Sequence, residues 1–188
     1  MRIILETPRL LFRELTAEDL PLLVELDSDP AVMRLISKGV PTSRETLAND
    51  HLPRILSYNG RTPPVGFWAA HLQSNREFAG WFHLRPDKLT PEEMELGYRL
   101  KRSAWGVGLA TEGARAIIEK ALGEWGWPRL SARTLAVNLA SQRVMQKAGM
   151  RFAHEFVYDE AVMPEWTVEE RRAVKYTLKR QQDRGCGF

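Results

Sequence analysis

The sequence predicts an α/β (α+β) fold in which helices cover both faces of a mixed sheet. Apolar side chains alternate along residues 94–100, as expected for a strand with one buried face. Along 109–122 the apolar residues instead recur at helical spacing, with charged residues on the opposite side. Strands and helices alternate only in part along the rest of the chain, which favours a mixed sheet over a purely parallel one.

Length and composition indicate one globular domain spanning 1–188. The chain has 188 residues, 44% hydrophobic and 27% charged, enough to enclose a substantial core. Its formal charge of +3 suits an anionic ligand, whereas scattered arginines without a known nucleic-acid motif argue against nucleic-acid binding. The single cysteine, Cys186, cannot form an internal disulfide, so we expect a reducing cytoplasm. We expect neither a membrane span nor a leader segment.

The N-terminal part is expected to contain one strand and then helices. Residues 8–13 form the strand, and Thr16 opens the first helix with a capping-box-like sequence in which Asp19 stands at the third helical position. Asp29 precedes a proline and suits the N-cap of a short helix over 31–36.

A third helix is expected to lead into a hairpin. A second capping-box candidate lies at 42–45 and opens a helix towards Tyr58, which ends at an Asn-Gly pair. Residues 65–73 and 77–84 then form two strands joined by a short polar turn. A loop over 86–91 precedes the strand at 94–100.

The C-terminal part is expected to supply the remaining strands and one helix. Residues 130–137 are β-like, and Asn138 is a natural N-cap for a helix that ends before Gly149. Strands follow over 151–158 and 168–178, and the tail beyond Arg180 is polar.

A glycine-rich turn, Trp105-Gly106-Val107-Gly108, separates the strand at 94–100 from the following helix. Glycines expose backbone N–H groups, and the helix adds its own unpaired N–H groups and positive dipole end. The turn is therefore either an ordinary tight connection or a cradle for pyrophosphate. It is not a nucleotide P-loop, because no Gly-Lys-Ser/Thr follows.

The motif Glu95-Leu96-Gly97-Tyr98, followed by Trp105-Gly106-x-Gly108-x-Ala110-Thr111-Glu112, resembles the acyl-CoA-binding core of the GNAT N-acetyltransferases. The similarity is greatest to the RimJ/RimL-type branch and covers about residues 7–180. Trp105 occupies the first position of the superfamily pattern Gln/Arg-x-x-Gly-x-Gly/Ala, as is common in this branch. The resemblance implies the GNAT fold, whose mixed, mostly antiparallel sheet has about six to seven strands.

The same resemblance implies acetyl-CoA as co-substrate and no metal. It divides the domain into acceptor-groove helices at about 16–60, a coenzyme-binding core at about 94–150 and C-terminal strands at about 151–180. The residues that it assigns to coenzyme binding are Trp105, Gly106, Val107, Gly108, Leu109, Ala110, Thr111, Asn138 and Ser141.

Transfer of acetyl to an amine needs a proton acceptor, and Glu95 is the candidate. A carboxylate within an apolar strand is costly unless it has a partner or a role. Either it is a surface carboxylate on a half-exposed strand, or it is the glutamate that GNAT enzymes often use, acting directly or through water. His83 lies near a strand end and is a further residue that could border the acceptor.

The departing thiolate needs a proton donor, and the resemblance points to Asn138 and Ser141. It implies that Asn138 contacts the pantetheine arm, in addition to capping a helix, and that Ser141 is placed to donate the proton. Many superfamily members carry a tyrosine four positions later, where this sequence has Met145. The acid is therefore Ser141 or water.

We expect direct attack by a primary amine on acetyl-CoA, because the only cysteine lies in the tail. A catalytically silent acyl-CoA-binding module and a ribosome- or RNA-associated protein are the alternatives. Acidic residues at 159–165 and near the first helices favour a protein N-terminal amine or a small cationic amine, unless they form only a solvated loop. The oligomeric state is expected to be a monomer or a homodimer.

Overall fold

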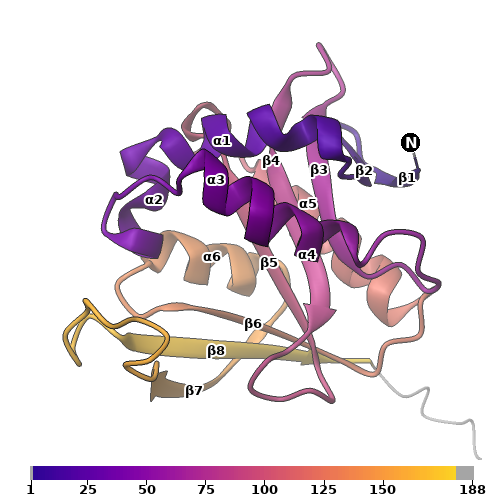
Figure 1. Cartoon of the computed structure of the whole chain (residues 1–188). Helices are drawn as coiled ribbons and strands as arrows, with labels where there is room; N and C mark the ends of the chain where they lie inside the picture. Colours follow the sequence, from indigo (N-terminus) through magenta and orange to yellow (C-terminus); the bar gives the residue numbers. More distant parts are fainter. Residues whose placement is uncertain (1, 181–188) are drawn as a thin grey trace, which may run out of the picture.

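The computed structural model describes residues 2–180, in which one eight-stranded sheet forms the centre of the molecule (Figure 1). The strand order is β1-β2-β3-β4-β5-β6-β8-β7. Only the β5–β6 pair is parallel, and every other neighbouring pair is antiparallel. The strands are β1 (Ile3–Glu6), β2 (Leu10–Glu14), β3 (Gly66–Leu72), β4 (Phe78–Pro86), β5 (Met94–Leu100), β6 (Arg129–Leu135), β7 (Arg151–Val157) and β8 (Arg172–Lys179).

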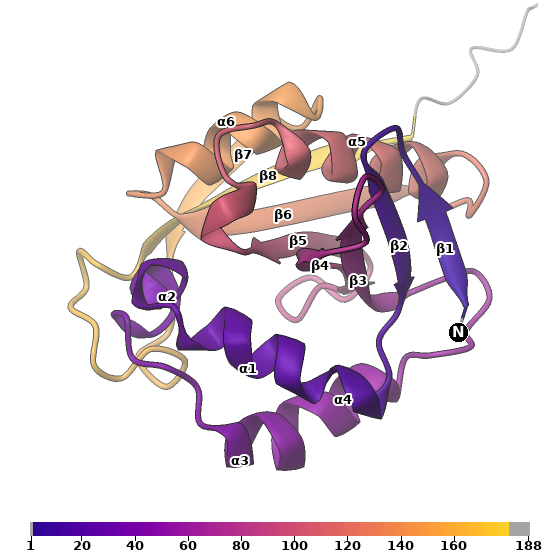
Figure 2. The same cartoon turned by 90° about the horizontal axis from the view of Figure 1, so that it is seen from above.

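Helices cover both faces of the sheet, as the sequence predicted (Figure 2). On one face lie α1 (Leu20–Ser28), α2 (Pro30–Ser37), α3 (Arg44–Thr46), η2 (Leu47–His51) and α4 (Leu52–Leu56). On the other lie α5 (Leu109–Leu122) and α6 (Leu139–Lys147), while the short turns η1 (Ala17–Asp19) and η3 (Arg102–Ala104) precede α1 and α5.

The alternation along the strands gives each face its own hydrophobic core. One core lies under α5 and α6, where Phe12, Phe82 and Ile117 are fully buried. The other lies under α1–α4 and includes Leu26 and Phe67. Helices α1–α4 are therefore held by a core of their own, on the face of the sheet opposite to α5.

Local capping signals predicted the helix starts well. The Thr16 N–H and hydroxyl both donate to the Asp19 carboxylate, at 2.7 and 3.2 Å. Asp29 accepts from the Ala31 N–H at 2.9 Å, and Asn138 accepts from the Ser141 N–H at 3.2 Å. Side-chain acceptors of this kind satisfy amides that a helix start leaves unpaired.

The third predicted helix start was wrong by one residue. Ser43, not Thr42, is the N-cap of α3, and its hydroxyl accepts from the Thr46 N–H at 3.0 Å. The Thr42 hydroxyl instead donates to Asp27 on α1 at 3.0 Å.

The expected six to seven strands were too few, because β1 was missed. A four-residue strand with a register shift between Ile3 and Leu5 is too short to show a clear alternation. The predicted strand at 168–178 also began four residues too early. Thr167 and Glu170 exchange hydrogen bonds that close a turn there, so β8 begins only at Arg172.

Some predictions lie outside the described residues, namely those on Cys186 and on the tail beyond Arg180. Between residues 2 and 180, no helix combines the length and apolarity needed to cross a membrane.

Candidate active site

Six consecutive backbone N–H groups, from Gly106 to Thr111, form a row at the start of α5. Within residues 2–180 none of the six donates to a protein acceptor, whereas the next amide, that of Glu112, donates to the Gly108 carbonyl at 3.0 Å. Gly106 and Gly108 have φ angles of 75° and 87°, a conformation that glycine adopts without strain. Free amides at a helix N-terminus bind anions, so this loop fits the pyrophosphate of a coenzyme.

The β1–β2 turn holds this loop in place. Arg9 reaches across from the turn, with its Nε 2.6 Å from Glu112 and its Nη1 donating to the Val107 carbonyl at 2.8 Å. The Thr7 hydroxyl donates to the same Glu112 carboxylate at 2.7 Å. Burial acts to raise the pKa of Glu112, but the hydrogen bonds from Thr7 and Arg9 outweigh it and lower the pKa. The loop is therefore shaped before any ligand binds.

Other predicted coenzyme residues surround the loop. Trp105 is half exposed, and its indole N–H donates to the Leu100 carbonyl at 2.9 Å. Val107 is exposed and Leu109 is buried beneath the helix start, while Ala110 and Thr111 are partly buried. These side chains line or support the amide row.

Beside the loop, β5 and β6 separate. Their pairing is limited to Met94 with Leu130 and Glu95 with Ser131, so Leu96–Leu100 has no partner strand on that side. An elongated ligand that begins at the amide row can lie along this unpaired edge.

Asn138 and Ser141 lie at the start of α6, near this gap. The Tyr98 hydroxyl on β5 donates to the Ser141 hydroxyl at 3.4 Å, so the two elements meet here. Burial raises the pKa of Tyr98, which keeps its phenol protonated. Met145, at the position of the superfamily tyrosine, is buried in the core.

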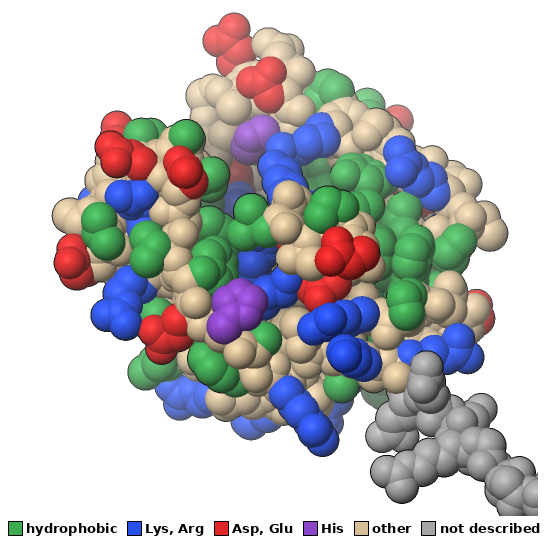
Figure 3. All heavy atoms as spheres, turned by 90° about the horizontal axis from the view of Figure 1, so that it is seen from below, with side chains coloured by type: hydrophobic (Ala, Val, Ile, Leu, Met, Phe, Trp, Pro, Cys, Tyr) green, Lys and Arg blue, Asp and Glu red, His purple; other side chains and the backbone are tan. Residues whose placement is uncertain are grey.

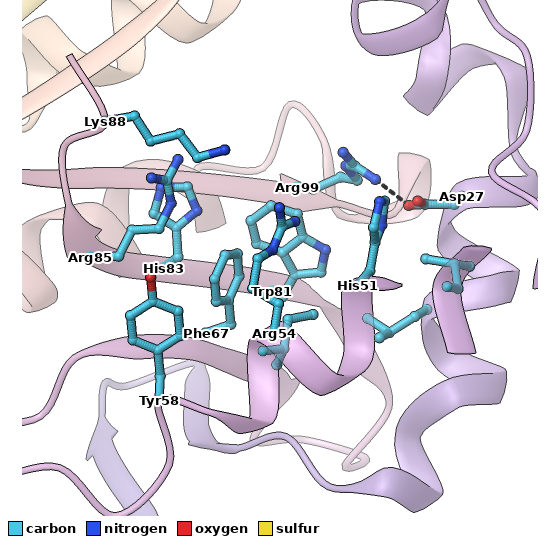
Figure 4. Close-up of a pocket in the computed structure, with 13 residues that line it drawn as sticks. Asp27, His51, Arg54, Tyr58, Phe67, Trp81, His83, Arg85, Lys88 and Arg99 are labelled. Atoms are coloured by element: carbon cyan, nitrogen blue, oxygen red, sulfur yellow. Dashed lines mark hydrogen bonds and ion pairs between the residues drawn. The ribbon is translucent and has the colours of Figure 1, made fainter. Parts of the chain in front are cut away.

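On the opposite face of the sheet, a pocket of about 200 Å³ lies between β3–β5 and the helices α1, η2 and α4 (Figure 4). Phe67, Trp81 and His83 form an aromatic wall. The His83 ring stacks on Trp81 at 5.7 Å and meets the edge of Phe67 at 5.0 Å. The hollow in the face seen in Figure 3 has lysine and arginine side chains gathered around it.

His83 fits this wall only because its neighbour on β5 is a glycine. His83 and Gly97 are register partners, and a Cβ on Gly97 would lie 2.6 Å from the imidazole. The ring is buried, and neither of its nitrogens has a hydrogen-bond partner within residues 2–180. Burial, together with the charges of Arg85, Arg133, Arg99 and Arg54, lowers the pKa of His83 well below its usual value. The imidazole is therefore neutral at pH 7.

Glu95 is buried beside His83, and the surface-carboxylate interpretation of this residue was wrong. Its Oε2 lies 4.0 Å from His83 Nε2 and 2.5 Å from Arg85 Nη2, and its Oε1 lies 3.0 Å from Arg133 Nη2. Oε2 receives no well-aligned hydrogen bond despite the close guanidinium. The carboxylate is thus both an ion-pair partner and a neighbour of the pocket imidazole.

Arg133 connects Glu95 to a buried ionic network. Its Nη2 lies 3.0 Å from Asp87, which accepts from the Ser131 hydroxyl at 2.7 Å. Lys175 on β8 lies 3.4 Å from Asp87 and 2.8 Å from Glu93. Glu95 therefore has a structural role in this network in addition to any chemical one.

The expected acidic acceptor groove was wrong for this pocket. Of the acidic residues expected near the first helices, which are Asp27, Asp29 and Asp50, only Asp27 lines the pocket. Its two oxygens accept from Arg99 and Thr42. Asp159, Glu160 and Glu165 are exposed in the β7–β8 loop. Glu160 lies 3.7 Å from Arg171. These carboxylates therefore face solvent or pair with residues of their own loop, and they do not line the pocket.

The sequence interpretation left out most of the pocket. Arg54, Trp81, Arg85, Lys88 and Arg99 all line it, and none was predicted as a site residue. The available signal was the alternation of Trp81, His83 and Arg85 along β4, on the same face as Glu95 and Arg99 of β5. No cluster of three or more metal-ligating side chains occurs in residues 2–180.

Comparisons with known proteins agree on one family. The description "Acetyltransferase (GNAT) domain" fits residues 9–151. A protein of Aspergillus fumigatus named FsC-acetyl coenzyme A-N(2)-transacetylase is 29% identical over 185 residues, which cover 95% of this chain and 77% of that protein. The uncharacterized protein YkkB of Bacillus subtilis is 31% identical over 132 residues, covering 68% of this chain and 73% of its own.

Solved structures show the same fold. A GNAT acetyltransferase from Bacillus anthracis has a TM-score of 0.74 at 21% identity, covering 96% of this chain and all (100%) of its own. RimL, a ribosomal L7/L12 α-N-protein acetyltransferase in complex with coenzyme A, has a TM-score of 0.74 at 17% identity, covering 95% and 98%. An aminoglycoside acetyltransferase with coenzyme A has a TM-score of 0.70 at 20% identity, covering 92% and 95%.

Proposed function

The chain belongs to the GNAT acetyltransferase family and is an acetyl-CoA-dependent N-acetyltransferase, and from this premise we propose that it acetylates a primary amine bound between Trp81, His83 and Arg99. One observation carries the proposal. Strand β5 leads at its Leu100 end towards the free amide row, and it also contributes Glu95 and Gly97 to the region of the pocket. A coenzyme on one face and an amine on the other can thus meet at the unpaired edge of β5.

The amine must lose a proton, and two groups beside the pocket can accept it. Glu95 is the acceptor expected from the family resemblance, directly or through water. His83 is the second candidate, because its imidazole is neutral and both nitrogens lack protein partners in the described chain. The carboxylate of Glu95, 4.0 Å from His83, would stabilise an imidazolium formed during the reaction.

The departing thiolate takes its proton from the Tyr98–Ser141 pair in this proposal. Tyr98 donates to the Ser141 oxygen, which leaves the serine O–H free to donate onward. Direct attack without a covalent enzyme intermediate is favoured, because the only cysteine is Cys186 near the C-terminus.

Similarity and charge support a proposal for the kind of acceptor. RimL and the aminoglycoside acetyltransferase act, by their titles, on a protein α-amine and on an aminoglycoside, which are the two acceptor kinds expected from the sequence. The pocket supports the α-amine of a protein or a related small molecule better than a cationic amine, because Arg54, Lys88 and Arg99 are among its lining residues.

The test is release of free CoA thiol from acetyl-CoA by the purified chain, with primary amines of different charge as acceptors. We expect amine-dependent thiol release and, by mass spectrometry, an acetylated amine. If CoA binds but no amine gives release above background hydrolysis, the chain is a silent acyl-CoA-binding module and the proposal is wrong.

A further inference from the structure

The lining of the pocket carries more positive than negative charge. Four cations reach it from three elements and a loop: Arg54 of α4, Arg85 of β4, Arg99 of β5, and Lys88 of the loop after β4 (Figure 4). Asp27 is the only carboxylate among the lining residues. A site built to attract a polycation would have the opposite balance.

Ion pairs neutralise two of these cations. Arg99 pairs with Asp27 and also lies over the Trp81 ring, 5.2 Å from its centroid. Arg85 lies 2.5 Å from Glu95, which it shares with Arg133. Both guanidinium groups are therefore held by protein partners.

Arg54 and Lys88 are different. Within residues 2–180 neither side chain forms an ion pair or donates a hydrogen bond, although both line the pocket. Burial lowers the pKa of His51 and, more strongly, that of His83. Both histidines are therefore neutral at pH 7 and do not change the charge of the pocket. The pocket thus has two uncompensated positive charges from opposite walls.

Such a pocket favours an acceptor with one amine and one nearby anionic group. A second ammonium would be repelled, whereas a carboxylate can pair with Arg54 and Lys88. The positive surroundings also favour the neutral form of the amine, which is the form that attacks. A volume of about 200 Å³ holds a moiety of amino-acid size rather than a large ring system.

We propose that the acceptor carries a carboxylate close to its primary amine, and that Arg54 and Lys88 bind this carboxylate while the amine faces His83. The inference rests on the proposed acetyl transfer to an amine. The carboxylate has two possible sources, a free amino acid or an acidic residue next to a peptide N-terminus.

The experiment compares amines matched in size and different in charge. Alanine, alaninamide and 1,2-diaminopropane present a carboxylate, a neutral amide and a second ammonium beside a primary amine. Tripeptides with a blocked C-terminus and with Asp, Asn or Lys at the second position test the peptide source. Each acceptor is measured by thiol release with wild type, with the double variant Arg54→Gln/Lys88→Gln, and with Lys179→Gln, an exposed lysine outside the pocket.

We expect the wild type to prefer the carboxylate member of at least one series by tenfold or more in kcat/KM. The double variant should lose at least tenfold on that member and less than twofold on the neutral one, and Lys179→Gln should match wild type. Added salt should narrow the difference between wild type and the double variant. The inference is overturned if the wild type prefers the neutral or cationic member. It is also overturned if the double variant prefers the carboxylate member as strongly as the wild type does.

Binding separates this inference from the proposed function. Titration calorimetry of the same amines into the CoA-saturated chain measures selection without turnover. If no amine is acetylated but the carboxylate member binds more tightly and loses this advantage in the double variant, the acetyl-transfer proposal fails and the charge inference stands. If binding shows no carboxylate preference, the charge inference fails whether or not acetylation occurs.

Discussion

Glu95 and His83 compete for one role, and their surroundings differ. Glu95 has guanidinium groups near both oxygens, whereas the His83 nitrogens have no protein partner in the described chain. The carboxylate is thus held by ion pairs within the sheet, whereas the two buried imidazole nitrogens have no partner in the described chain and remain available to a substrate that enters the pocket. Substitution of each residue in turn can distinguish the residue that accepts the proton from the one that only supports the structure of the site.

Glu95→Gln is expected to lower kcat by about 10²-fold with little change in acetyl-CoA affinity, if the carboxylate moves the proton. His83→Gln is the matched variant. Because the pKa of His83 lies well below 6.5, wild-type activity should persist below pH 6.5 and fall only as the imidazole becomes protonated. If His83 is the proton acceptor, His83→Gln removes this acid limb and Glu95→Gln moves it. A Glu95→Gln enzyme with wild-type kcat at every pH removes Glu95 from the reaction.

Ser141→Ala tests the proton donor on the other face of the sheet. The Tyr98–Ser141 contact predicts a lower kcat with an almost unchanged dissociation constant for CoA, because the serine N–H that binds Asn138 is retained. Steady-state kinetics and calorimetry measure the two quantities. A loss confined to affinity would make Ser141 a binding contact instead of an acid.

The loop between β5 and α5 can be tested as an element. Gly108→Asp places a carboxylate beside the free amides. The backbone φ at this position is 87°, and the added Cβ would lie 3.4 Å from Arg9 Nη2. The negative charge and the strained backbone should weaken CoA binding at least tenfold, or about 1.4 kcal/mol. Gly126→Asp is the control for the added charge and the strained backbone, because Gly126 has a similar φ of 73° and no heavy atom lies within 4 Å of an added Cβ. Unchanged affinity in a folded Gly108→Asp variant would place the coenzyme elsewhere.

The sequence predicted β5 and the helical spacing along α5 correctly, because each element has a clear hydrophobic period. The strand β1 was missed because four residues with a register shift show no period. The pocket was beyond sequence reasoning for a different reason. His83 meets Gly97, and Arg133 meets Glu95, only through strand register, which hydrophobic pattern alone does not assign between strands.

At the scale of the whole molecule, the gap between β5 and β6 divides the sheet into two parts. The strands β1–β5 and β6–β8 share only two paired positions along this seam. The buried ionic network crosses the seam: Asp87 and Glu93 flank the loop before β5, while Arg133 and Lys175 lie on β6 and β8. Side-chain ion pairs thus join the halves next to the two paired positions, and we expect this network to hold the two halves together.

Asp87 is the centre of that network, and its substitution tests the idea. Burial acts to raise the pKa of Asp87, but hydrogen bonds from Ser131 and the Leu89 N–H, with the charges of Arg133 and Lys175, lower it overall. Asp87→Asn leaves these two cations without their shared partner. Because Arg133 keeps Glu95 and Lys175 keeps Glu93, the free energy of unfolding at pH 7 should fall by about 1.5–3 kcal/mol, as for the loss of a buried hydrogen bond to a charged group.

The pH dependence gives the sharper test. A carboxylate with a lowered pKa stabilises the fold above its unfolded pKa of about 3.9 and loses this contribution as pH falls through the folded value. The stability difference between wild type and Asp87→Asn should therefore be constant from pH 7 to 5 and shrink below about pH 4. Urea unfolding at several pH values measures it. Glu124→Gln, which removes the partner of Lys120 on the exposed surface, should cost at most about 1 kcal/mol. If Asp87→Asn costs no more than this control, or if its cost does not change with pH, then the network does not hold the two halves of the sheet together.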